Sequence, residues 1–216
     1  MKIAVSVMPV LNDFPDPHEA DIIDGVIAVG GDLDAPNLKL SYSMGIFPWP
    51  HEGYPLLWFC PDERGILEFA DLHVSRSLEK WVRKYEPFIK VTVNEAFSTV
   101  IVECQQQLRQ GQKGSWITPE IIEAYSQLSQ QGNALSVECW IDDELISGIY
   151  GVKSKNYFSC ESMFFKRSNA SKYAFLKLVE HLKSLGFAWM DLQMVTDVCE
   201  SLGGKYISRE EFLERI

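Results

Sequence analysis

The sequence lacks several features that would place it in common classes of protein. No apolar run approaches the roughly 20 residues that a membrane-spanning helix needs. Residues 1–11 imitate a signal peptide only briefly, because Pro9 interrupts the apolar stretch and no small-residue cleavage site follows. We therefore expect a first β-strand over Met1 to Leu11, no membrane segment, and a cytoplasmic protein.

Disulfide and metal-binding patterns are also missing. The five cysteines form no C-x-x-C pair and are Cys60, Cys104, Cys139, Cys160 and Cys199. An odd number of scattered cysteines predicts reduced thiols in a cytosolic protein. The four histidines are equally dispersed and carry no H-E-x-x-H pattern, so we expect no metal site.

Basic residues are scarce at the start of the chain. The net charge is −10, and residues 1–71 hold twelve acidic residues against three basic ones. Two later segments are basic instead: residues 72–90 have five bases against two acids, and residues 153–177 have six against one. Such patches attract phosphates locally. Solvated surface helices remain the alternative explanation.

Proline is concentrated near the N-terminus, where seven of the ten prolines precede Pro61. This spacing favours short strands, turns and one short helix, which Asp34-Ala35-Pro36 opens and which reaches about Met44. We therefore predict a small, loop-rich N-terminal α/β domain over residues 1–66. Residues 67–216 then form the larger domain.

The larger domain is predicted to mix helices and strands. Helices are expected over Ser75–Lys84, from Asn94 as cap to about Leu108, from Thr118 as cap with Gly132 just past the end, over Ala170–Leu185, and after a capping box at Ser208-x-x-Glu211. Strands are expected over Ile89–Val93, Leu135–Ile141, Leu145–Lys153, Tyr157–Phe165 and Phe187–Leu192, with a flexible loop at Gln110–Gly114. Antiparallel strands followed by a helix and one more strand are the core order of the acetyltransferase-like (GNAT-like) α+β fold.

Glycine is missing where that fold usually binds acetyl-CoA. Enzymes of this class place a glycine-rich turn between the core strand and its helix, where backbone N–H groups hold pyrophosphate. Here the connection, residues 166–172, contains no glycine. Gly30-Gly31-Asp32 matches neither a P-loop nor G-x-G-x-x-G, and Ser162 lacks the G-x-S-x-G elbow of serine hydrolases. A different activated acyl donor must therefore be considered.

Twelve short blocks, in order along almost the whole chain, carry a more specific signal. They are Val29-Gly30-Gly31-Asp32-Leu33, Tyr42-Ser43-Met44-Gly45-Ile46-Phe47-Pro48-Trp49, Trp58 with Cys60-Pro61-Asp62, His73-Val74-Ser75-Arg76-Ser77-Leu78, Gly114-Ser115-Trp116-Ile117-Thr118, Ala124-Tyr125, Ser136-Val137-Glu138, Tyr150-Gly151-Val152, Glu161-Ser162-Met163-Phe164, Asn169-Ala170-Ser171-Lys172, Asp191-x-Gln193 and Ser201-Leu202-Gly203. Together they resemble the leucyl/phenylalanyl-tRNA–protein transferase family.

The resemblance implies a fold, an activity and partners. The fold is a small N-terminal domain followed by an acetyltransferase-like domain. The activity is transfer of leucine, phenylalanine or methionine from charged tRNA to proteins or peptides with N-terminal Arg or Lys, which marks them for degradation. Because an aminoacyl ester is already activated, amide formation needs no cofactor, neither ATP nor metal. The enzyme must align the amine, remove a proton and stabilise the oxyanion.

Asp191 and Gln193 are the candidate catalytic residues. They lie two apart at the end of a predicted strand, so both point to one face. A glutamine takes no proton at neutral pH, but its amide can orient the nucleophile or the ester while the Asp191 carboxylate fixes that amide or the amine. The resemblance also places the catalytic pair here.

Glu161 is the candidate residue for binding the acceptor. In the predicted strand it shares a face with Met163 within an apolar stretch, where an unpaired carboxylate is costly. The matching family glutamate suggests recognition of the cationic acceptor end. The alternative is an internal salt bridge, for instance with Lys172.

The remaining candidates concern the donor. By their matching positions Ile149, Phe158 and Met163 are candidates for the apolar donor side-chain pocket, although each is equally consistent with plain core. Trp49 and Trp116 are predicted in loops, where aromatic residues anchor packing or stack on adenosine. The resemblance supports binding of the donor's adenosine end by both, with Tyr42 nearby.

Four basic residues recur at three- to four-residue spacing on one face of a predicted helix: Arg76, Lys80, Arg83 and Lys84. That geometry allows contact with tRNA phosphates without reading sequence.

The match has departures near the chemistry, and two rival functions stay open. Family members usually have glycine where Cys160 precedes Glu161, and a cysteine side chain there would crowd the acceptor site. One rival is an enzyme of this fold that transfers amino acids to a small molecule or a cell-wall peptide. The other is a non-catalytic protein that binds aminoacyl-tRNA or N-terminal degrons.

Overall fold

A computed structural model describes residues 13–107 and 114–216. The strand expected over Met1 to Leu11 lies outside these residues, as do the first four positions of the expected Gln110–Gly114 loop. Within the described part, no helix is both long and apolar enough to cross a bilayer.

The N-terminal part forms a small sheet with one helix. Strands β1 (Val26–Val29), β3 (Leu57–Phe59) and β2 (Phe47–Pro48) pair in the order β1-β3-β2, and helix α1 (Ala35–Ser43) lies beside them. The predicted start of α1 is confirmed, because the Asp34 side chain accepts a hydrogen bond from the Asn37 N–H. Trp58 is fully buried, and its indole N–H donates to the Gly30 carbonyl.

The larger part is built on a seven-stranded sheet. Its order is β10 (Lys205–Ser208), β4 (Glu63–Glu68), β9 (Trp189–Gln193), β8 (Phe158–Phe165), β7 (Glu144–Lys153), β6 (Ala134–Ile141) and β5 (Lys90–Val93). Neighbouring strands are antiparallel except β8 and β9, which are parallel. Helix α5 (Ala170–Ser184) makes the crossover between that parallel pair. The predicted acetyltransferase-like α+β fold is confirmed.

Strand β4 crosses the boundary expected between the two domains. It begins at Glu63 and ends at Glu68, and it pairs with β9 and β10 of the larger sheet. The chain therefore changes sheet between Phe59 and Glu63, and a division after residue 66 falls inside β4.

The helices cover the larger sheet on both faces. Helices α3 (Phe97–Gln106) and α4 (Pro119–Gln130) lie on one face, whereas α5 and α2 (Arg76–Tyr85) lie on the other. Short elements η2 (Glu86–Phe88), α6 (Asp197–Ser201) and α7 (Arg209–Arg215) complete the described chain.

Two buried clusters follow from these layers. The α4-side cluster joins residues of α3 and α4 to the N-terminal sheet, for example Tyr125 to Trp58. The α5-side cluster joins α5 and α2 to the opposite face of the sheet, for example Phe175 to Leu78. Because the α4-side cluster contains side chains from both parts of the chain, the N-terminal part shares its core with the larger sheet.

In the larger part of the chain, the predicted helix caps were right at two positions and wrong at one. Thr118 accepts from the Ile121 N–H, and Ser208 accepts from the Glu211 N–H. Asn94 does not cap α3, which has Ala96 as N-cap. Asn94 takes a left-handed conformation with φ 59°, and its side chain accepts from the Ser136 N–H. The amide therefore ties the β5–α3 turn to β6, and the helix begins later.

Candidate functional site

The site is built where β8 and β9 separate. These parallel strands pair only at Phe158 with Met190 and at Ser159 with Asp191. Two residues further along each strand, Gln193 Nε2 donates to Glu161 Oε1 at 2.9 Å. Side chains thus bridge the gap that the backbones leave open.

Asp191 is held behind this gap by hydrogen bonds to both carboxylate oxygens. Arg64 Nε and the Gln193 N–H donate to Oδ1 at 2.8 and 2.7 Å, and Arg64 NH2 and Ser159 Oγ donate to Oδ2 at 2.7 and 2.8 Å. The side chain is fully buried. With four donors around it, the carboxylate is held in place with both oxygens occupied, which leaves it poorly placed to accept a proton from substrate.

Arg64 is as closely confined as the carboxylate it pairs with. Its guanidinium lies 4.6 Å from the Phe47 ring centroid and 4.4 Å from that of Phe212, and NH1 donates to the Gly45 carbonyl. Although burial alone lowers the pKa of Arg64, the adjacent Asp191 charge and its hydrogen bonds raise that pKa overall. The pair is therefore a fixed part of the floor of the site.

Gln193 owes its position to an unusual backbone. It has φ 61°, a left-handed conformation that is rare outside glycine, and its N–H is tied to Asp191. The adjacent strand allows this turn because position 65 is glycine: a Cβ there would lie 2.8 Å from the Met194 carbonyl carbon. The turn aims the Gln193 amide at Glu161, and Ser159 Oγ lies 3.3 Å from the same Nε2 atom.

Glu161 is placed by a β-bulge, which corrects the prediction that it shares a face with Met163. Tyr150 and Gly151 pair with Ser162 and Cys160, so Glu161 is the extra residue of β8. The bulge shifts the alternation of the faces. Glu161 therefore contacts Tyr125 on the α4 side, whereas Met163 packs against the α5-side cluster.

The suggested salt bridge between Glu161 and Lys172 is also absent. Lys172 lies on α5 and donates to the Ser201 hydroxyl. The Glu161 carboxylate instead has neutral neighbours: the Gln193 amide at Oε1 and the Tyr125 hydroxyl, 3.5 Å from Oε2.

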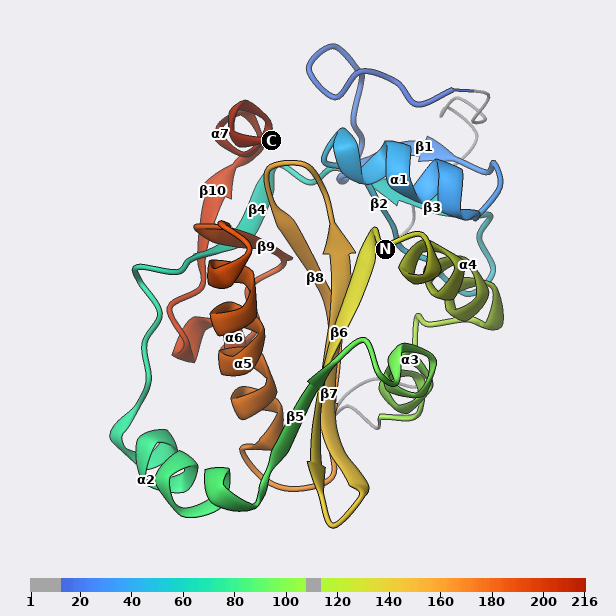
Figure 1. Cartoon of the computed structure of the whole chain (residues 1–216). Coiled ribbons are helices and arrows are strands. Elements are labelled where there is room, and N and C mark those ends of the chain that lie inside the picture. Colours follow the sequence, from blue (N-terminus) through green and yellow to red (C-terminus); the bar gives the residue numbers. More distant parts are fainter. Residues whose placement is uncertain (1–12, 108–113) are drawn as a thin grey trace.

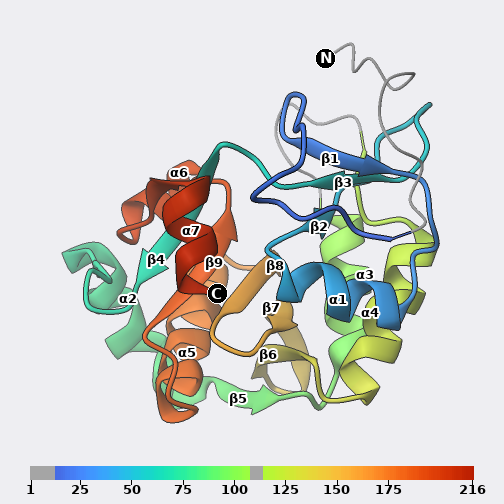
Figure 2. The same cartoon turned by 90° about the horizontal axis from the view of Figure 1, so that it is seen from above.

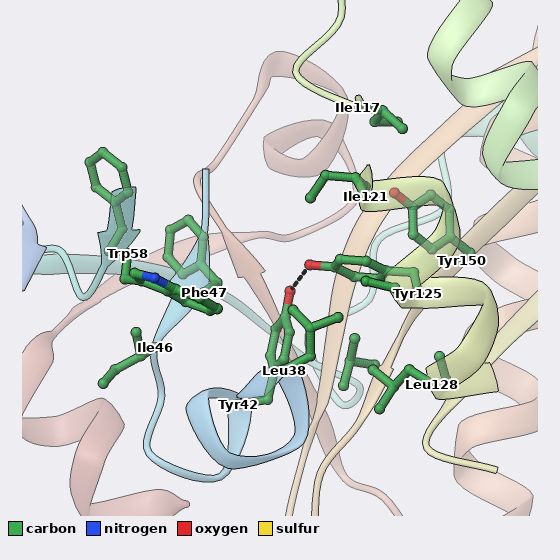
Figure 3. Packing of buried hydrophobic residues seen from close by; sticks show 14 of the residues in the cluster. Leu38, Tyr42, Ile46, Phe47, Trp58, Ile117, Ile121, Tyr125, Leu128 and Tyr150 are labelled. Atoms are coloured by element: carbon green, nitrogen blue, oxygen red, sulfur yellow. Dashed lines mark hydrogen bonds between the residues drawn. The ribbon is translucent and has the colours of Figure 1, made fainter. Parts of the chain in front are cut away.

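The surroundings of Glu161 bring its pKa to about 7. Burial raises the pKa most, hydrogen bonds from Tyr42 and Gln193 lower it, and the negative charge of Asp191 raises it. The hydroxyls of Tyr42 and Tyr125 lie 2.6 Å apart (Figure 3), and burial raises the pKa of both phenols well above the ordinary value. Glu161 thus exchanges its proton near neutral pH while the two phenols stay protonated.

A hollow of ≈ 120 Å³ opens above this network. Its lining consists of Phe47, Pro48, Trp49, Trp116, Glu161, Leu192, Gln193, Met194 and Thr196. The volume lies below the roughly 300 Å³ of a pocket that encloses a whole ligand, so it fits the reacting groups, with the two indoles at hand for a flat ring. Glu161 is the one charged side chain among these nine residues.

The structure thus brings four of the predicted site residues to one hollow: Trp49, Trp116, Glu161 and Gln193. Trp49 is partly exposed and packs against the rings of His51 and Phe59, with centroids 4.9 and 5.4 Å away. Asp191 and Tyr42 do not line the hollow. Asp191 accepts a hydrogen bond from the Gln193 N–H, and the Tyr42 hydroxyl contacts that of Tyr125, which lies beside Glu161.

The other predicted residues lie elsewhere. Ile149 and Phe158 are fully buried in the α5-side cluster, with Met163 packed against it. The four bases of α2 are exposed on the far side of α5 from α1 (Figures 1 and 2), and one of them, Arg83, pairs with Glu79.

Three residues of the site carried no role in the sequence interpretation: Arg64, Ser159 and Tyr125. Arg64 is one of only three bases in residues 1–71, and it lies two positions after the Cys60-Pro61-Asp62 block. This position could have indicated that Arg64 belongs to the site. Ser159 lies two positions before Glu161, so strand alternation alone indicated its face. No local pattern pointed to the contact of Tyr125 with Tyr42, 83 positions away.

Cys160 does not crowd the hollow. Its side chain packs against the α5-side cluster, on the opposite face of β8 from the Glu161 carboxylate. Burial raises the pKa of its thiol well above the ordinary value.

Family models and sequence relatives all match this chain to one family of proteins. Residues 66–216 match the family model described as leucyl/phenylalanyl-tRNA protein transferase, and residues 31–62 match the model of its N-terminal domain. A leucyl/phenylalanyl-tRNA–protein transferase of Flavobacterium johnsoniae is 49% identical over 200 residues, covering 93% of each chain. That of Pectobacterium carotovorum is 44% identical and covers 94% of this chain and 85% of its own length.

A likeness among solved structures concerns the fold alone. A conserved protein of unknown function from Bacteroides thetaiotaomicron superposes with a TM-score of 0.50 at 8% identity, covering 79% of this chain and 64% of that one.

Proposed function

This chain belongs to the leucyl/phenylalanyl-tRNA–protein transferase family, and we propose that it transfers leucine, phenylalanine or methionine from charged tRNA to N-terminal Arg or Lys of proteins. The observation that supports this most is the contact of Gln193 with Glu161 in a hollow flanked by Trp49 and Trp116. The proposal places the enzyme in the cytoplasm, where charged tRNA is found, and the transfer marks the acceptor for degradation.

We assign binding of the donor's terminal adenosine to the two indole side chains. Trp49 and Trp116 offer ring faces at the hollow, and base–aromatic stacking contributes about 1–3 kcal/mol per base. The adenosine that carries the ester would stack there, leaving the ester carbon beside Gln193. The donor side chain would pass between the separating strands toward Ile149, Phe158 and Met163, which lie on the other face of the sheet.

The transfer is a single displacement at the ester carbonyl. The neutral α-amine of the acceptor attacks the carbonyl carbon, a C–N bond forms, and the C–O bond to the ribose breaks. The amine loses one proton to the Glu161 carboxylate, and the ribose oxygen leaves with the bonding electron pair and takes up a proton. A carboxylate with a pKa of about 7 suits this exchange, because it accepts and returns a proton near neutral pH.

Asp191 and Gln193 take different parts in this scheme. The Gln193 amide faces the hollow, so it orients the amine or the ester oxygen directly. Asp191 has no place in the lining and acts through the Gln193 backbone and Ser159. It is a positioning residue rather than a group that touches substrate.

Acceptor selection follows from the charge of the hollow. An N-terminal Arg or Lys brings an α-ammonium and a cationic side chain, and Glu161 is the single charged group among the described residues that line the hollow. An ionised Glu161 attracts the cationic side chain of this end. The α-amine loses its ammonium proton to solvent and attacks in the neutral form, and Glu161 takes the proton released in that step.

A panel of peptides tests the proposal. Peptides beginning with Arg or Lys are expected to receive labelled amino acid from charged tRNA, and the same peptides with an acetylated α-amine or an N-terminal Asp are not. Equal labelling of the acetylated peptides, or none of any peptide, would contradict it.

A further inference from the structure

A second and larger hollow, of ≈ 550 Å³, lies at the junction of α1, the β7–β8 turn and the segment between α5 and β9. Three lysines line it from two of these segments: Lys39 of α1, and Lys153 and Lys155 at the turn. All three are exposed. No Asp or Glu is among the described residues of the lining, which is unusual in a chain that carries 30 acidic and 20 basic residues.

These lysines have no ion-pair partner among the described residues, as is also true of Arg76, Lys80 and Lys84 on α2. Lys166, Lys177 and Lys205, by contrast, each pair with a carboxylate. Three unpaired ammonium groups around one concave surface create a local positive potential that attracts an anion.

The rest of the lining indicates which anion fits. Val152, Phe187 and the half-exposed Leu185 add apolar surface, while Ser43, Ser154 and Asn133 add neutral polar groups. A bare phosphate would make no favourable contact with the apolar part of the lining. A nucleotide has phosphate, ribose hydroxyls and a flat apolar base, so it uses all three.

The hollow is connected to the proposed reaction site through Tyr42. This residue lines the hollow, its carbonyl accepts from the Tyr157 hydroxyl, and its own hydroxyl contacts Tyr125 beside Glu161. The basic face of α2 has no such link, because α2 lies on the far side of α5 (Figures 1 and 2).

We propose that Lys39, Lys153 and Lys155 bind the sugar–phosphate backbone of the donor tRNA, beyond its terminal adenosine. The inference rests on the proposed function, since it names a second contact of the same donor. It predicts that the hollow contributes to binding of tRNA and not to the chemistry.

The test combines tRNA binding with transfer from two donors. The variant is Lys39→Gln/Lys153→Gln/Lys155→Gln, and the corresponding triple Lys→Arg variant keeps the charge. Kd for tRNA is measured over a range of salt concentrations. Transfer of phenylalanine to an Arg-initiated peptide is measured from phenylalanyl-tRNA and from 3′-phenylalanyl-adenosine, which carries no phosphate.

For the Gln variant we expect Kd and KM for the tRNA donor to rise roughly tenfold or more, with kcat unchanged. Since each phosphate contact contributes about 0.7–0.9 to the slope of log affinity against log salt, loss of three contacts makes that slope shallower by about 2–3. Transfer from the phosphate-free donor stays at the wild-type rate, and the Arg variant retains wild-type binding.

Two results would overturn the inference. One is a Gln variant with wild-type Kd and salt slope. The other is a loss confined to Lys80→Gln/Arg83→Gln/Lys84→Gln, which removes equal charge from α2. Absence of transfer by the wild type from either donor would defeat the proposed function instead, and the Kd comparison would still decide whether this hollow binds tRNA.

Discussion

Gln193 donates a hydrogen bond to Glu161 across the gap where β8 and β9 stop pairing, with 2.9 Å between Nε2 and Oε1. One partner is fixed by a left-handed backbone tied to Asp191, and the other by a bulge in β8. The first is an orienting amide and the second a titrating carboxylate. The roles of the two residues in transfer are therefore separable by mutation.

Glu161→Gln is expected to remove a pH dependence as well as activity. The Glu161 carboxylate is ionised, and so able to take a proton, only as pH rises through its pKa of about 7. In the wild type, kcat/KM for the peptide should therefore increase through that range. The variant should not show this increase of kcat/KM with pH. Its rate should fall by roughly 10²–10⁴-fold, the usual contribution of a general base.

The measurement is a pH–rate profile with saturating charged tRNA. A residual increase near pH 8 in the variant is expected, because a protein α-amine has a pKa near ~8. If kcat/KM of Glu161→Gln still increased near pH 7 as in the wild type, proton transfer to this carboxylate would be contradicted.

Arg64→Gln is expected to destabilise the whole fold. It leaves the fully buried Asp191 carboxylate without its cation, and breaking a buried pair by removing one partner costs about 3–5 kcal/mol. Urea unfolding gives the free energy. The matched control is Arg83→Gln, whose partner Glu79 is exposed, and which should cost less than about 1 kcal/mol. Equal costs for the two variants would refute the assigned role of Arg64.

Tyr42→Phe and Tyr125→Phe are expected to be coupled. The two hydroxyls lie 2.6 Å apart in the α4-side cluster, so removing one leaves the other buried with a lost partner, at about 1–3 kcal/mol. In the double variant neither hydroxyl faces a missing partner, and the loss of the Tyr125 contact with Glu161 is already part of the Tyr125→Phe effect. The double variant should therefore be more stable than the sum of the single effects predicts. A double-mutant cycle of unfolding free energies checks this, and additive effects would show that the contact is unimportant.

Cys160→Gly is expected to affect stability but not acceptor binding. The side chain packs on the α5 side of β8, opposite the Glu161 carboxylate. Glycine in a strand and the lost packing should lower stability by about 1 kcal/mol. KM for the acceptor peptide should stay within about twofold of wild type. A marked fall in that KM would instead mean that the thiol crowds the acceptor.

Elements defined by local patterns were predictable from the sequence. Thr118 with Pro119 starts α4 where expected, since a cap needs only residues three positions away. The prediction that Asn94 caps α3 was wrong because its side-chain amide oxygen accepts a hydrogen bond from the N–H of Ser136, 42 positions along the chain. The same residue type serves a cap or a tertiary contact, and sequence does not separate the two.

Candidate site residues could be named from the sequence, but their geometry could not. The structure brings the candidates Asp191, Gln193 and Glu161 together. The bulge that separates Glu161 from Met163 depends on pairing with β7 rather than on alternation within β8. The partner that holds Asp191 is Arg64, 127 positions away. Such contacts arise from the order of strands in the sheet, which the local pattern does not contain.

The most direct test of the account is transfer of labelled leucine or phenylalanine from charged tRNA to an Arg-initiated peptide, by the wild type and by Gln193→Ala. We predict turnover by the wild type and its loss in the variant, with the folded state and tRNA binding retained. No transfer by a folded wild type from leucine, phenylalanine or methionine donors would contradict the transferase. Wild-type turnover in Gln193→Ala would contradict the site.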